Sequence, residues 1–175
     1  LTIPSTTSFK YDGFLRQFKS IQTSAKTTYS AAVSGNGTAV TDLNITITPK
    51  FATSLIILTW MINGEMHYNT SWTVLQNGAL ITDVAYPAYN RELGNVRYSG
   101  LMATTYDLNE SSTPFNGYLQ YAVIAGSTAA RTYAPAVRSS NATAYTLYLN
   151  RTIASTGADN QEQSVSTGQA MEIYR

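Results

Sequence analysis

The chain has 175 residues and a mass of 19.1 kDa, the size of one domain, so separate cofactor and substrate domains are not expected. Charged residues make up only 12% of the sequence and the formal net charge is +1. Because Lys and Arg form no cluster, the sequence lacks the electrostatic basis for binding nucleic acid. The absence of Cys excludes disulfides and thiolate metal sites. Abundant Ser, Thr and Asn, with 13 Tyr, favour strands and turns, so we predict an all-β protein.

The longest apolar run covers residues 55–62. It is much shorter than the 17 or so residues with which a helix crosses a bilayer. We therefore predict no membrane segment and no membrane partner. The chain opens on Leu1-Thr2-Ile3-Pro4 without an initiator Met or a signal-peptide pattern, which indicates a trimmed chain or a portion of a longer one.

Residues 1–19 have scattered aromatic and basic side chains without a clean period, and they predict an extended N-terminal arm. Its aromatic side chains need a place to be buried. Two interpretations remain open: the arm packs on its own domain, or it docks on a partner or a neighbouring subunit. The residues assigned to docking are Phe9, Lys10, Tyr11, Phe14, Arg16, Phe18 and Lys19.

From residue 20 onward, turn signals recur at the spacing of a sandwich or barrel, so residues 20–175 are predicted to form one domain. In residues 43–48, apolar and polar side chains alternate, which indicates one buried face. Asn77-Gly78 is the strongest hairpin signal. The expected strands are 20–33, 43–48, 55–62, 72–76, 79–84, 96–106, 117–124, 143–150 and 168–174, with long loops at 86–95, 107–116 and 153–167. This pattern predicts an antiparallel β-sandwich, jelly-roll-like, with an extended N-terminal arm.

The segment 55–62 is apolar on both sides, so we expect it to be a central strand with one face on the other sheet. Its second face then needs another layer or another subunit. Cyclic assembly would cover that face symmetrically. The residues predicted to form this oligomer core are Leu55, Ile57, Trp60 and Ile62.

The sequence offers no recognisable catalytic constellation. His67, the single histidine, follows a predicted turn at residues 64–66, and one histidine cannot build a two-histidine metal site. No Gly-x-Ser-x-Gly elbow accompanies it. Asp107 and Glu110 form the closest exposed acidic pair, and they fit a solvated loop better than a calcium site. We predict no catalytic residues, no metal and no cofactor.

Two features remain ambiguous. Asn-x-Ser/Thr sequences begin at Asn36, Asn44, Asn69, Asn109, Asn141 and Asn150, which chance explains in part in a chain so rich in Ser and Thr. Aromatic, amide and guanidinium side chains gather in a candidate recognition loop, of a kind suited to stacking on a sugar or filling a partner's pocket. The loop residues are Tyr86, Tyr89, Asn90, Arg91 and Tyr98.

Five segments, in order, resemble a small β domain found in virion proteins of tailed phages. Residues 45–50 and 54–58 are similar to its "ITPK…S-K-I-L-V" strand pair, and residues 74–81 to its hairpin. Residues 147–151 resemble its "Y-I-N-R" strand and residues 169–173 its closing "M-E-I". The matches span about residues 20–175, although Leu55 replaces the usual Lys.

This resemblance implies a jelly-roll-like domain, often trimeric, on the exterior of a phage particle. One position is that of a capsid-decorating (cement or head-protrusion) protein, which its arm would attach to the major capsid protein or another virion protein. The other is the head of a tail fibre or spike that recognises a host surface glycan. The arm and the short chain favour decoration, and a non-enzymatic role agrees with the residues.

Overall fold

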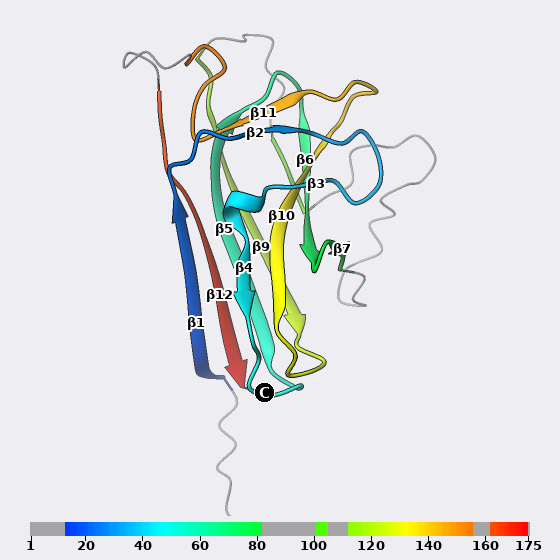
Figure 1. The fold of residues 1–175 in the computed structure, drawn as a ribbon, viewed down its shortest axis with the longest axis vertical. Helices are drawn as coiled ribbons and strands as arrows, with labels where there is room; N and C mark the ends of the chain where they lie inside the picture. The colour runs from blue at the N-terminus through cyan, green and yellow to red at the C-terminus, as the bar shows by residue number, and fades with distance from the viewer. Residues whose placement is uncertain (1–12, 82–100, 105–111, 156–161, 175) are drawn as a thin grey trace, which may run out of the picture.

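The computed structural model describes residues 13–81, 101–104, 112–155 and 162–174. Within these residues the chain is all-β: two antiparallel sheets pack face to face, and no α-helix is present. A single 3-10 turn, Thr41–Leu43, interrupts the strands. Figure 1 shows most of the long strands running along the longest axis of the molecule. The predicted β-sandwich is confirmed.

The first sheet is built around β5 (Leu55–Glu65). On one side β5 pairs with β12 (Ser166–Tyr174), which in turn pairs with β1 (Phe14–Thr23). On its other side β5 pairs with β9 (Phe115–Ile124). At its upper end in Figure 1, β11 (Thr146–Leu149) and β2 (Thr28–Ser30) extend the sheet. The central position predicted for residues 55–62 is therefore correct, and the strand continues through the predicted turn at 64–66 as far as Glu65.

The second sheet is centred on β10 (Arg131–Ser139) and β6 (Thr70–Gln76). Beside β10 lie β3 (Thr38–Ala39) and β4 (Ile45–Ile47). Beside β6 lie β7 (Ala79–Leu80) and β8 (Met102–Ala103). The predicted hairpin at Asn77-Gly78 is present, with φ of 51° and 80° at its two turn residues, as a two-residue turn of this type requires.

The sequence did not predict β10, and Pro135 explains why. A proline inside a central strand is unusual because it cannot donate a ladder hydrogen bond. On the side away from β6, however, β10 is covered by two short strands in succession: β4 pairs with Arg131–Tyr133 and β3 with Ala136–Val137. Pro135 lies at the junction between them, and its carbonyl accepts a hydrogen bond from the Val40 N–H at 2.9 Å.

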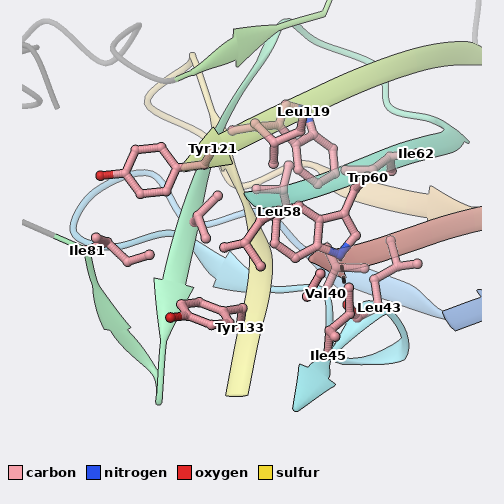
Figure 2. Close-up of a cluster of buried hydrophobic side chains, with 14 of the residues drawn as sticks. Val40, Leu43, Ile45, Leu58, Trp60, Ile62, Ile81, Leu119, Tyr121 and Tyr133 are labelled. Atoms are coloured by element: carbon pink, nitrogen blue, oxygen red, sulfur yellow. Dashed lines mark hydrogen bonds between the residues drawn. The ribbon is translucent and has the colours of Figure 1, made fainter. Parts of the chain in front are cut away.

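The core lies between the sheets. Along β5 every second side chain, from Ile56 to Ile62, is buried against the second sheet. Figure 2 shows Trp60 within this cluster, with its indole Nε1 donating to the Leu43 carbonyl at 3.0 Å. Trp60 and Ile62 were predicted to form an oligomer contact, and that prediction is wrong. They are 1% and 0% exposed, because alternate side chains of β5 point into the core and these two belong to that set.

The boundary of the arm also differs from the prediction. Residues 14–19 are not a separate arm, because they form the first part of β1 and pair with β12 from Phe14↔Tyr174 to Lys19↔Ala170. A register shift between Leu15 and Gln17 marks a β-bulge at Arg16. The strand could be missed because β1 is an edge strand, and its side chains from Phe14 to Ser20 show no alternation of buried and exposed positions.

Candidate functional site

The outer face of the first sheet exposes side chains from four neighbouring strands. Opposite the buried half of β5, Leu55, Ile57, Thr59 and Met61 point outward. The strand register aligns them with outward residues of β1, β12 and β9 in cross-strand rows. From the lower end upward, the rows are Leu15, Ile173, Leu55 and Ile124; Phe18, Met171, Ile57 and Ala122; Ser20, Gln169, Thr59 and Gln120; and Gln22, Thr167, Met61 and Tyr118.

We call these four rows the uncharged face, because none of their side chains carries a charge. The two lower rows are entirely apolar, and Phe18 is 48% exposed. Lys19 pairs with the buried Ala170, so it belongs to the opposite side of the sheet. Natural sheets that face water usually place charged side chains on the open face and edges. Depletion of charge is instead typical of the centre of a protein interface.

At the lower end of the first sheet, Arg16 is the centre of an exposed aromatic cluster. Its guanidinium carbon lies 5.1, 5.4 and 5.0 Å from the ring centroids of Phe14, Phe51 and Tyr174. The rings of Phe51 and Tyr174 meet edge to face at 4.8 Å. Two of the predicted docking residues, Phe14 and Arg16, therefore come together, where the chain enters β1. Phe18 and Lys19 lie further along β1, on opposite sides of the sheet.

At the upper end of the same sheet there is a pocket of about 290 Å³, which we call the tyrosine pocket. His67, Ala144, Tyr145, Thr146, Tyr148 and Ile153 line it. Tyr145 stacks on Tyr68 with ring centroids 4.9 Å apart and planes 9° apart, and the His67 ring lies 5.3 Å from Tyr145. The guanidinium carbon of Arg151 lies 4.6 Å from the centroid of Tyr148. His67 therefore lies among aromatic side chains, in the connection between β5 and β6.

A buried carboxylate holds the backbone of Ile153, one of the residues that line the tyrosine pocket. Glu65 is 1% exposed, and its Oε2 accepts a 2.6 Å hydrogen bond from the N–H of Ile153. Its Oε1 accepts from the N–H of Thr113 at 3.1 Å and from the Thr113 hydroxyl at 2.7 Å. The end of β5 therefore holds two separate loops. With all three of these bonds in place, the carboxylate is engaged in structure and is not directed at a ligand.

A second buried carboxylate joins two of the segments on which the resemblance rests. Glu172, within "M-E-I", accepts hydrogen bonds from the N–H groups of Lys50 and Phe51 and from the Gln17 side chain. Burial alone would raise the pKa of Glu172, but these hydrogen bonds outweigh it and hold the pKa below the ordinary value. The glutamate thus ties β12 to the "ITPK" turn and to the bulge of β1.

A buried amide accounts for a third segment. Asn150, in "Leu147-Tyr148-Leu149-Asn150-Arg151", has a φ of 57°, and its Nδ2 donates to the carbonyls of Thr23 and Ala25 at 3.0 and 2.9 Å. Its Oδ1 accepts from the Ser166 hydroxyl at 2.6 Å. With both amide protons engaged and the residue 0% exposed, Asn150 is not available for glycosylation in the folded chain. The sequence marked Asn150 only as the start of an Asn-x-Ser/Thr sequence, and it did not identify the structural roles of this asparagine or of the two glutamates.

Several predicted residues lie outside the described part of the chain, and the structure neither supports nor opposes their roles. They are Phe9, Lys10 and Tyr11 of the arm, the acidic pair Asp107 and Glu110, and the recognition-loop residues Tyr86, Tyr89, Asn90, Arg91 and Tyr98. Of the predicted oligomer core, Leu55 and Ile57 lie on the uncharged face.

Among the residues that the structure describes, no three His, Asp or Glu side chains lie close enough to hold a metal ion. No helix in the described ranges is long and apolar enough to cross a membrane. Comparison with protein-family models and with curated proteins finds no match to this chain.

Proposed function

We propose that this protein is a non-enzymatic structural component on the exterior of a tailed-phage particle, where it assembles as a homotrimer. The observation that carries the proposal is the uncharged face, which places two apolar rows and two neutral rows of side chains on one open sheet. Burying such a face stabilises association at roughly 25 cal/mol per Å² of apolar surface. The order of the five resembling segments supports the phage assignment.

A second copy of the chain is the occupant that suits this face best. A partner with a strongly charged surface would lose hydration of its charges without gaining an opposite charge. A copy of the same face brings no like-charge repulsion, and its Ser, Thr and Gln side chains can hydrogen-bond to their equivalents across a symmetry axis. Cyclic closure then covers the face in every subunit.

Attachment to the particle is assigned to the N-terminal residues. The Arg16 cluster places exposed aromatic rings and a guanidinium where the described chain begins. Such residues are typical anchors of protein interfaces. A capsid-decorating position and a fibre-head position both fit self-association, and they differ in what these residues contact: a major capsid protein in the first case, the rest of a fibre in the second.

Light scattering on the purified protein tests the trimer, with a matched pair of alanine-to-lysine variants. Ala122 lies in an apolar row of the uncharged face, whereas Ala130 is exposed in the β9–β10 connection. We expect the wild type and Ala130→Lys to have three times the 19.1 kDa mass of one chain, and Ala122→Lys to be monomeric. A monomeric wild type, or a trimeric Ala122→Lys, contradicts the proposal.

A further inference from the structure

The tyrosine pocket has the features of a binding site for a single small ring. Its volume of about 290 Å³ is at the lower limit of ligand pockets, which begin at about 300 Å³. Its lining combines the rings of Tyr145, Tyr148 and His67 with the hydroxyl-bearing Thr146. Aromatic side chains of this kind offer an apolar face and a polar tip to the same ligand.

The pocket is held in shape before any ligand arrives. Glu65 fixes the backbone at Ile153, and the Tyr145 carbonyl accepts a 2.8 Å hydrogen bond from the Ala31 N–H. The Tyr145 ring packs against the rings of both Tyr68 and His67, which also lie next to each other, and Arg151 donates from Nη1 to the Ser155 carbonyl at 2.7 Å. A site whose side chains are already ordered loses less entropy when it binds.

We infer that the tyrosine pocket binds one pyranose ring of a saccharide. A pyranose has C–H groups on its faces and hydroxyls around its rim, and these match the tyrosine rings and the polar tips of Tyr148, Thr146 and His67. Among the described residues, no Asp, Glu or Lys lines the pocket, and glycosidic cleavage needs two facing carboxylates, so the described lining favours binding. Arg151 beside Tyr148 adds a guanidinium that can donate to a ring hydroxyl or a sugar carboxylate.

A proline-rich peptide is the main competitor, since such peptides also bind to aromatic side chains. They do so in an extended groove, with a rise of about 3.1 Å per residue and contacts from several residues. The tyrosine pocket is instead a compact site whose described aromatic lining comes from the 66–69 turn and from Tyr145 and Tyr148, at and just before β11. Its size favours one ring over a peptide segment. The inference does not rest on self-association, because the pocket lies at the upper end of the sheet and shares no residue with the uncharged face.

The test is an NMR titration of the full chain with D-glucose, D-galactose, N-acetylglucosamine and D-glucuronate, each up to about 50 mM. We expect at least one sugar to shift the signals of His67, Tyr145, Tyr148 and Ile153, with a dissociation constant of the order of 1 to 10 mM, which corresponds to a binding free energy of about 3 to 4 kcal/mol. A stronger effect of glucuronate than of glucose would assign a role to Arg151.

Two variants separate the pocket from general tyrosine effects. Tyr148→Ala should weaken binding at least about tenfold, whereas Tyr118→Ala, which removes a tyrosine that is 61% exposed on the uncharged face, should leave it unchanged. Tyr148→Phe keeps the ring and should retain most of the affinity, with thermal unfolding used to verify that each variant is folded. The inference is wrong if none of the four sugars shifts these signals, or if Tyr148→Ala and Tyr118→Ala weaken sugar binding equally. It is also wrong if a pentaproline peptide binds at this site and the sugars do not.

Discussion

The carboxylate of Glu172 accepts a 2.7 Å hydrogen bond from the backbone N–H of Lys50, which lies 122 residues earlier in the chain. The same oxygen accepts from the N–H of Phe51 at 3.2 Å. The turn that follows Pro49 thus presents two backbone donors to one buried acid, and the last strand of the sheet fixes the connection between β4 and β5. This is a physical reason for "ITPK" and "M-E-I" to occur together in one chain.

Glu172→Gln is therefore expected to destabilise the fold by about 1 to 3 kcal/mol at pH 7. An amide has one accepting oxygen in place of two, so it cannot accept from both backbone N–H groups and from the Gln17 side chain as the carboxylate does. The depressed pKa of the Glu172 carboxyl stabilises the fold fully above its ordinary value of 4.5, and this contribution is lost as the pH falls through the lower pKa of the folded state. Urea unfolding at several pH values between 7 and 3 measures both effects.

The control for Glu172 is Glu162→Gln. The pKa of Glu162 is also lowered, by the Ser112 hydroxyl that donates to it, but the side chain is fully exposed. Its substitution should leave the free energy of unfolding and its acid dependence almost unchanged. If the two variants lose acid dependence equally, the stabilising role assigned to Glu172 is wrong.

Asn150 provides a second stability test, because its side chain and its backbone make separable contributions. Asn150→Ala removes the bonds to Thr23, Ala25 and Ser166 and places a Cβ-bearing residue without compensating bonds at a φ of 57°. We expect a loss of at least about 2 kcal/mol in the free energy of unfolding. Asn150→Gly removes the same bonds, but glycine adopts a positive φ without strain, so this variant should lose less free energy of unfolding than Asn150→Ala. Equal losses in the two variants would show that the backbone conformation at residue 150 contributes little.

Local patterns in the sequence were sufficient for the strands that alternate and for the hairpin. Residues 43–48 alternate cleanly and contain β4, and Asn77-Gly78 forms the predicted turn. The apolar segment 55–62 predicted a central strand. It did not show which set of alternate side chains points inward, because both sets are largely apolar. That choice depends on packing against the second sheet and on the 3-10 turn between β3 and β4, where the Leu43 carbonyl accepts the hydrogen bond of the Trp60 indole. Hence Trp60 was assigned to the wrong surface.

The candidate sites were harder to predict because they are made of long-range contacts. Glu65 binds Thr113 across 48 residues and Ile153 across 88. The rings of the tyrosine pocket come from the 66–69 turn and from residues 144–153, and no spacing in the sequence links them. The uncharged face becomes visible only when the register of four strands is known, since each strand contributes only alternate residues.

Gly168→Ala tests the packing of the core at Trp60. A Cβ at position 168 would lie 2.5 Å from Trp60 Cδ1 and 2.6 Å from its Nε1, so the indole must move and its hydrogen bond to Leu43 must weaken. We expect a loss of about 1 to 3 kcal/mol and a change in tryptophan fluorescence. Gly126→Ala is the comparison, because nothing lies within 4 Å of its added Cβ and the change carries only the cost of its φ of 69°. Equal losses in the two variants would contradict the crowding at Trp60.

The last prediction concerns attachment of the protein to a particle, and the structure changes where the chain should be cut. Deletion of residues 1–19 would remove the first part of β1, including the bond from Gln17 to Glu172 and the Arg16 cluster, so that variant should be destabilised whatever the arm binds. Deletion of residues 1–12 leaves β1 intact. We expect the shorter deletion to keep the oligomeric state and the unfolding midpoint of the intact chain but to lose binding to particles stripped of the protein, measured by co-sedimentation. If the variant lacking residues 1–12 still co-sediments like the intact chain, the docking residues lie elsewhere. Arg16→Ala in the intact chain would then test whether the Arg16 cluster alone provides the contact.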